Sequence, residues 1–117
     1  MKTMIVALGL ALSVVACQPG KEDAGATAQQ APLYVDVRTT QEFASGHVQG
    51  ALHIPVEEIE QRWNELEPFR DQQIIVYCRT GRRSAKAIEV LQAHGFTNLE
   101  NGGGFDALKA AGVPAAP

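Results

Sequence analysis

The chain has 117 residues, which is enough for one domain and too few for two. It carries 13 acidic and 10 basic residues, so its overall balance is acidic. A second basic stripe and an aromatic platform, which nucleic-acid-binding proteins use, are both missing from the sequence. We therefore exclude nucleic acid as a partner.

Residues 1–16 have the pattern of a secretory signal. Lys2 is followed by an apolar run and then by small residues. This apolar run is too short to span a membrane. We therefore expect an exported protein from which residues 1–16 are removed.

The signal ends in Val14-Val15-Ala16-Cys17, which resembles the lipobox of bacterial lipoproteins. This resemblance implies cleavage before Cys17 and attachment of a lipid to its sulfur. Gln18 after the cysteine resembles the outer-membrane lipoproteins of Gram-negative bacteria. The alternative is ordinary signal cleavage, which would give a soluble periplasmic protein, because Val14 and Ala16 also satisfy the small-x-small rule.

The rest of the chain divides by composition. Residues 17–32 are polar and rich in Ala, Gln and Gly, and we interpret them as the lipidated cysteine and a flexible tether. Residues 33–114 remain for one folded domain, followed by a short tail at 115–117. A core of this size is only modestly stable.

The first half of the domain shows alternating strand and helix patterns. Residues 33–37 form an apolar, β-branched run that predicts a buried strand. Thr39 and Glu42 have the spacing of a capping box, which predicts a short helix. Residues 51–54 predict a second strand. An amphipathic helix ending at Pro68 is expected next, with these apolar residues on one face: Val56, Ile59, Trp63 and Leu66.

The second half repeats this alternation. Residues 73–77 predict the central strand, and Ser84 is expected to cap a helix that Gly95 closes. Residues 96–99 predict a last strand. The three glycines at 102–104 then predict a tight turn before a terminal helix at 105–111. Strands that alternate with helices indicate an α/β domain with a mostly parallel sheet flanked by helices.

Cys78 is the strongest candidate for a reactive group. It lies between the predicted central strand and the following helix, in a short loop that contains Gly81. Free N–H groups at a helix N-terminus stabilise an anion, so a thiol there is shifted toward the nucleophilic thiolate. If Cys17 is lipidated, Cys78 also has no partner for a disulfide, and an unpaired thiol in an oxidising compartment suggests a function.

Positive charge gathers around this thiol. Residues 72–88 contain no acidic residue, although the chain as a whole is acidic. A local positive patch in an acidic protein suits a small anionic substrate. The basic residues of this stretch are Arg79, Arg82, Arg83 and Lys86.

Several motifs resemble the rhodanese domain in order and spacing. They are Val35-Asp36-Val37-Arg38, Glu42-Phe43, the stretch from Gly46 to Pro55, the loop from Tyr77 to Ser84, Gly95-Phe96, the glycines at 102–104 and Ala111-Gly112-Val113-Pro114. The resemblance covers nearly all of residues 33–114. It is greatest to the short, single-domain, exported thiosulfate sulfurtransferases of bacteria, which implies a rhodanese-like α/β fold.

The resemblance implies a two-step sulfur transfer through a Cys78 persulfide. Thiosulfate would be the donor, and cyanide or a cellular thiol would be the acceptor. The N–H groups of the loop can surround a sulfur atom, and its arginines can hold the sulfonate by paired hydrogen bonds. We favour Arg83 and Arg79 for this contact, with Arg82 third. The expected substrate-binding residues are Arg79, Thr80, Gly81, Arg82, Arg83 and Ser84.

Other polar residues of the motifs are interpreted as structural. Asp36 and Arg38 match the end of the family's strand, and Arg38 is expected to pair with Glu42, four positions later. His47 and His53 fit a fold motif better than a metal site, because no second ligand type clusters with them in the sequence. We expect neither a metal nor a cofactor.

Two other functions use the same residues. Cysteine phosphatases and arsenate reductases have five residues between the cysteine and an arginine, whereas Ser84 stands at that position here and Arg83 comes one position earlier. The loop is therefore expected to be too small for a phosphate. A non-catalytic persulfide carrier or binding module would share every residue with the enzyme, and only turnover separates the two.

Overall fold

The computed structural model describes residues 31–117, and these residues form one compact unit. The predicted signal at residues 1–16, the predicted lipidation site Cys17 and nearly all of the predicted tether lie outside the described residues. Within residues 31–117, no helix has both the length and the apolar character needed to cross a membrane.

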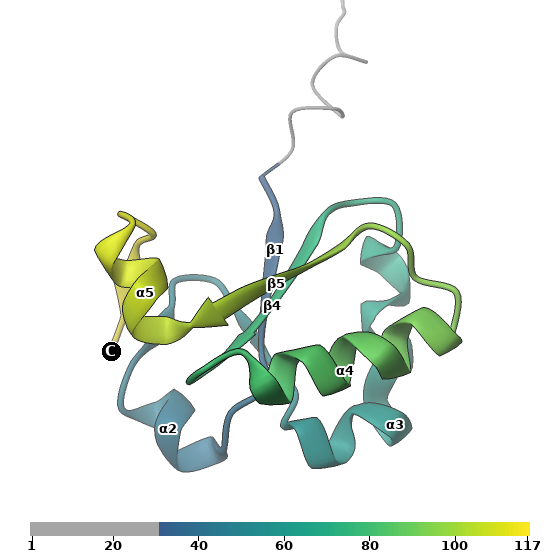
Figure 1. The fold of residues 1–117 in the computed structure, drawn as a ribbon, viewed down its shortest axis with the longest axis horizontal. Coiled ribbons are helices and arrows are strands. Elements are labelled where there is room, and N and C mark those ends of the chain that lie inside the picture. Colours follow the sequence, from purple (N-terminus) through teal and green to yellow (C-terminus); the bar gives the residue numbers. More distant parts are fainter. Residues whose placement is uncertain (1–30) are drawn as a thin grey trace, which may run out of the picture. The chain divides into compact units, whose positions relative to one another are not determined.

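Strands and helices alternate along the described part of the chain (Figure 1). In chain order, the elements are β1 (Leu33–Asp36), α2 (Thr40–Ala44), β2 (His47–Val48), β3 (Leu52–His53), η2 (Val56–Glu58), α3 (Ile59–Arg62), η3 (Trp63–Phe69), β4 (Ile74–Cys78), α4 (Arg82–Ala93), β5 (Leu99–Gly104), α5 (Phe105–Ala110) and β6 (Ala115–Ala116).

The main sheet has the strand order β3-β1-β4-β5, and all of its neighbouring strands are parallel. In Figure 1, α3 and α4 lie to one side of β1, β4 and β5, and α2 and α5 lie to the other. Helices on both sides explain why all five residues of β4 are buried, since a strand covered on both faces can be apolar throughout. The predicted α/β class with a parallel sheet is confirmed.

The core lies between the sheet and its helices. Ile59 of α3, Leu66 of η3 and Leu91 of α4 are buried in it, which confirms that these apolar residues face inward. Trp63 is only partly buried, and its ring stacks on His94 with 4.1 Å between the ring centroids. The remaining core residues are Val35, Val37, Ile54, Ile74, Val76, Cys78, Ala87 and Phe96.

The structure corrects the helix predicted between Val56 and Pro68. This segment is divided into a 3-10 turn, one short α-helical turn and a second 3-10 stretch, and Pro68 lies inside the last of these. Proline lacks the N–H group that a continuing α-helix requires, which agrees with the break in this segment. The pattern predicted the inward-facing residues correctly and the continuity of the helix wrongly.

The last strand also differs from the prediction. The glycines at 102–104 were predicted as a turn, but they form the end of β5, which runs beside Tyr77 and Cys78 of β4. The register between the two strands shifts after Val76, as it does at a β-bulge. Residues 96–98, which were predicted as strand, precede β5.

A second, two-stranded antiparallel sheet joins β2 to β6. His47 pairs with Ala116, and Val48 pairs with Ala115. Two residues of the segment interpreted as a tail, 115–117, therefore belong to a strand. The sequence gives no signal for this pairing, because each strand has only two residues.

Candidate active site

Cys78 is the last residue of β4, and α4 begins four residues later. This places the thiol at the carboxyl end of a central parallel strand, where ligands bind in open α/β sheets. The residue is completely buried. Among residues 31–117 it is a free cysteine.

The loop after Cys78 turns a backbone N–H toward the sulfur. The backbone N–H of Gly81 donates to Cys78 Sγ over 2.9 Å. Burial alone raises the pKa of the thiol, but hydrogen bonds from the backbone N–H and hydroxyl of Ser84 and from the N–H groups of Thr80 and Gly81 outweigh it. Together they lower the pKa of Cys78 to about 7. A large share of the thiol is therefore ionised near neutral pH, as a nucleophile requires.

A glycine makes this loop geometry accessible. Gly81 precedes the first residue of α4 and has a φ of 97°, in the left-handed region that L side chains rarely adopt. Ser84, which was predicted to cap the helix, is instead its third residue. The chain must turn sharply after Cys78 to direct the Gly81 N–H at the sulfur, and glycine adopts the conformation of this turn most easily.

Ser84 and Asn101 hold the loop in place through hydrogen bonds. Ser84 Oγ lies 3.7 Å from Cys78 Sγ, 3.0 Å from the Gly81 carbonyl oxygen and 2.7 Å from Asn101 Oδ1. A hydroxyl has one proton, so Ser84 donates to one of these three at a time. Asn101 Nδ2 donates to the Gly81 carbonyl, and Asn101 Oδ1 also accepts from the Gly103 N–H, both over 2.9 Å. Strand β5 thus holds the loop through Asn101.

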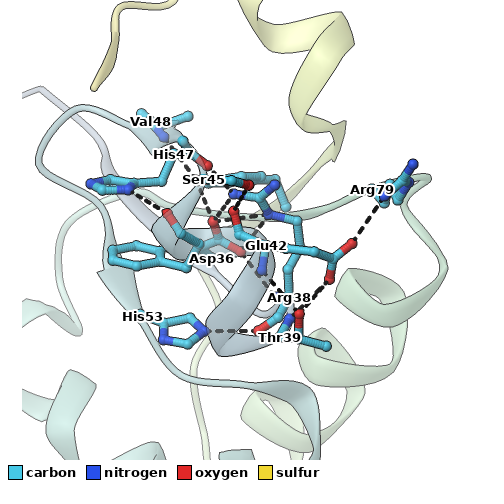
Figure 2. A network of polar contacts seen from close by, with 12 residues as sticks. Asp36, Arg38, Thr39, Glu42, Ser45, His47, Val48, His53 and Arg79 are labelled. Atoms are coloured by element: carbon cyan, nitrogen blue, oxygen red, sulfur yellow. Dashed lines mark hydrogen bonds and ion pairs between the residues drawn. The ribbon is translucent and has the colours of Figure 1, made fainter. Parts of the chain in front are cut away.

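Two arginines of the loop region converge on one carboxylate. Arg83 makes paired contacts with Glu42, with Nη1 at 2.9 Å from Oε1 and Nη2 at 3.3 Å from Oε2. Arg79 Nη1 lies 3.3 Å from Glu42 Oε2. A dashed line marks this contact in Figure 2. The hydrogen bond from Arg83 is the main cause that lowers the pKa of Glu42 to about 2. Glu42 is therefore ionised at neutral pH.

The capping box predicted from Thr39 and Glu42 is confirmed. Glu42 Oε1 accepts from the backbone N–H of Thr39 over 3.0 Å and from its hydroxyl over 3.1 Å. The predicted pair between Arg38 and Glu42 is wrong. Arg38 binds Asp36 instead. Both residues are buried, and a buried charge is strongly destabilising unless an opposite charge pairs with it.

This buried pair forms a second network beside the loop (Figure 2). Arg38 Nε contacts both carboxylate oxygens of Asp36, at 2.9 and 3.0 Å, and its Nη2 donates to the Gly46 carbonyl over 2.6 Å. The hydroxyl of Tyr77 donates to Asp36 Oδ2 over 2.8 Å and accepts from the Val48 N–H over 2.9 Å. The network links β1 and β4 to β2, just before the reactive thiol.

A shallow polar depression lies beside Arg79. Its lining does not include Cys78. The residues that line it are Arg38, Ser45, Arg79, Phe105, Asp106 and Lys109.

The structure brings together most of the residues that the sequence singled out. Thr80, Gly81 and Ser84 surround the sulfur, whereas Arg79 and Arg83 meet at Glu42. Arg82 is exposed on the first turn of α4. Sequence reasoning missed Glu42 and Asn101 as parts of the site. Glu42 was already explained by its capping box, and no motif draws attention to Asn101.

Comparisons with known proteins identify the class of this domain. Residues 14–111 match the Rhodanese-like domain family. The match starts before residue 33, where the sequence predicts the domain to begin.

Individual relatives agree with this class. The chain is 39% identical over 72 residues to the thiosulfate sulfurtransferase PspE of Escherichia coli, covering 62% of this chain and 69% of that protein. It is 37% identical over 83 residues to a sulfurtransferase of Allochromatium vinosum, covering 70% and 76% of the two chains. Among solved structures, a rhodanese with anions from E. coli has a TM-score of 0.64 and 36% identity, and the match covers 74% of this chain and 98% of that one.

The chain belongs to the rhodanese-like domain family. Membership supports sulfurtransferase activity in general. It also agrees with the geometry above, in which a thiol with a lowered pKa sits among N–H donors at a strand end.

Proposed function

We propose that the protein is a thiosulfate sulfurtransferase that carries sulfur on Cys78. The observation that supports this most is the hydrogen bond from the Gly81 N–H to Cys78 Sγ, beside a pKa of the thiol lowered to about 7. N–H donors in this position stabilise a thiolate before the reaction and a terminal persulfide sulfur after it. The identity to PspE supports thiosulfate as the donor.

In the first half-reaction, the Cys78 thiolate attacks the outer sulfur of thiosulfate. A new S–S bond forms to Cys78, the S–S bond of thiosulfate breaks, and its electron pair leaves with sulfite. The total charge of minus three is conserved, because the products are a persulfide anion and the sulfite dianion. In this proposal Arg83 and Arg79 bind the sulfonate, with Arg82 third.

In the second half-reaction, cyanide or a thiolate attacks the outer persulfide sulfur. The persulfide S–S bond breaks and returns its electron pair to Cys78, and thiocyanate or a new persulfide leaves. The N–H groups of Thr80, Gly81 and Ser84 then donate hydrogen bonds to the thiolate again. No metal or cofactor enters either step.

Intact mass tests this cycle. The reduced protein is treated with thiosulfate and then with cyanide. We expect the mass of one sulfur atom to be added at Cys78 and then to disappear as thiocyanate forms. A folded Cys78→Ser variant is expected to take up no sulfur.

The outcomes separate the alternatives. A persulfide that forms but resists both cyanide and small thiols would favour a carrier that hands sulfur to a protein. Wild-type protein that takes up no sulfur, or turnover in folded Cys78→Ser, would refute the proposed enzyme.

We further propose that the domain acts on the periplasmic side of a bacterial membrane, tethered through a lipid on Cys17. The sequence of residues 14–17 supports this. Labelling with radioactive palmitate in a Gram-negative host tests it, because Cys17→Ser should lose the label. If the wild-type protein takes up no palmitate and is recovered in the soluble periplasmic fraction, the soluble alternative would be favoured.

A further inference from the structure

Glu42 occupies the side of Arg79 and Arg83 on which an anion would bind. Its two oxygens face the two Nη atoms of Arg83, at 2.9 and 3.3 Å, in the paired arrangement that a guanidinium also makes with a sulfonate. The same carboxylate contacts Arg79. An incoming anion that uses these donors must displace Glu42 or share them with it.

Hydrogen bonds restrain the side chain of Glu42. The backbone N–H and hydroxyl of Thr39 both donate to its Oε1, so the start of α2 holds the carboxylate in place. Its side chain is only 20% exposed, whereas that of Arg79 is 71% exposed. The restrained carboxylate therefore faces an exposed cation, Arg79, and a partly buried one, Arg83, and it cancels part of their charge.

We propose that Glu42 is a specificity-determining residue that lowers the affinity of the Cys78 loop for anionic reactants by neutralising Arg83 and Arg79. This inference deepens the proposed function, on which it rests for the identity of the donor. The carboxylate acts as a built-in competitor of the sulfonate. It leaves the loop accessible to uncharged reactants and reduces occupation of the arginines by other anions.

Glu42→Gln removes the negative charge at this position and changes little else. Glutamine is nearly the same size, and its amide oxygen can still accept from Thr39, since capping boxes use glutamine as well as glutamate. Arg83 and Arg79 then lose their counter-charge without losing the start of α2. The matched control is Glu65→Gln, which also removes the charge of a glutamate bound to an arginine, but at the exposed surface of η3. Its partner Arg62 keeps Glu58 as a second counter-charge.

The readout is the alkylation of Cys78 in the full-length protein by iodoacetate, an anion, and by iodoacetamide, its uncharged analogue. In both reactions the thiolate displaces iodide. The ratio of the two rate constants cancels changes in thiolate fraction and in access to the buried sulfur. Removing one charge several ångströms away in a partly solvated site is expected to raise this ratio about 3- to 10-fold, at low ionic strength.

We expect the ratio of the iodoacetate to the iodoacetamide rate constant to rise in Glu42→Gln and to stay unchanged in Glu65→Gln. A parallel fall in KM for thiosulfate is expected in the same variant. An unchanged or lower ratio in folded Glu42→Gln would overturn the inference and would mean that Glu42 holds the arginines in position instead. If no variant, wild type included, transfers sulfur from thiosulfate, the proposed function fails while the alkylation ratio still decides the role of Glu42.

Discussion

Gly104, at the end of β5, packs directly against the carbonyl group of Arg79 in the reactive loop. A Cβ atom at position 104 would lie 2.3 Å from the Arg79 carbonyl oxygen and 3.1 Å from its carbon. No real side chain approaches a backbone atom this closely. The loop after Cys78 can adopt its form because the neighbouring strand has no side chain at this point.

Gly104→Ala is therefore expected to displace the loop. Overpacking of this kind lowers the free energy of unfolding by about 1–3 kcal/mol. The displaced loop is expected to lower the rate of sulfur transfer at least about tenfold. Urea unfolding and steady-state kinetics measure the two effects. Gly112→Ala is the control, because it strains the backbone at a φ of 96° but meets nothing within 4 Å. Equal activity in the two variants would contradict the role of Gly104.

The lowered pKa of Cys78 predicts a pH profile. Because the pKa is about 7, below the ordinary value of 9.0, the thiolate fraction and the rate of alkylation by iodoacetamide should rise through pH 7 and level off above it. Ser84→Ala removes the hydroxyl that helps to stabilise the thiolate, so the midpoint should move to higher pH. Absorbance of the thiolate near 240 nm follows this directly.

Ser45→Ala is the control for that shift. Its hydroxyl is exposed and donates to the Glu42 carbonyl, so the midpoint should stay in place. A Ser84→Ala midpoint equal to that of the wild type would show that the backbone N–H groups alone set the pKa of Cys78.

Asp36→Asn is expected to be strongly destabilising. It removes the counter-charge of Arg38, whose side chain is only 6% exposed, and an unpaired buried charge costs about 3–5 kcal/mol. Tyr77→Phe removes one hydroxyl from the same network and should cost about 1–2 kcal/mol. Denaturation by urea gives both values. If Asp36→Asn cost no more than Tyr77→Phe, the ion pair would not be the main element of the network.

Arg83→Ala is expected to raise KM for thiosulfate by about 10- to 100-fold, since a paired, charge-assisted contact is worth roughly 1.5–3 kcal/mol. Arg82→Ala is the matched comparison within the same helix turn, because Arg82 is exposed. A larger rise in KM for Arg82→Ala than for Arg83→Ala would reverse the proposed order of the two arginines.

Local sequence patterns predicted the elements that carry the chemistry. The apolar run before Cys78 predicted β4, and Gly81 with the helical pattern after it predicted the loop and α4. Thr39 and Glu42 predicted the start of α2 through their spacing. These features depend on neighbours within a few positions, so a single stretch of sequence contains enough information to predict them.

Local patterns fail where a contact between distant segments decides the element. The three glycines at 102–104 are typical of a turn, yet they form a strand because Gly102 and Gly104 let β5 approach Ile75 and Arg79 more closely than any side chain would permit. Two-residue strands such as β2 and β6 leave no periodic pattern at all.

By itself, then, the sequence determined the α/β class, the position of the thiol and the basic character of its loop. Only the tertiary structure decided the partners of the charged and polar groups. Glu42 meets Arg83 across 41 residues, Tyr77 meets Asp36 across 41, and Ser84 meets Asn101 across 17. Such contacts arise when parallel strands bring their carboxyl ends to one edge, and the choice of Asp36 over Glu42 as the partner of Arg38 follows from which side chains are buried there.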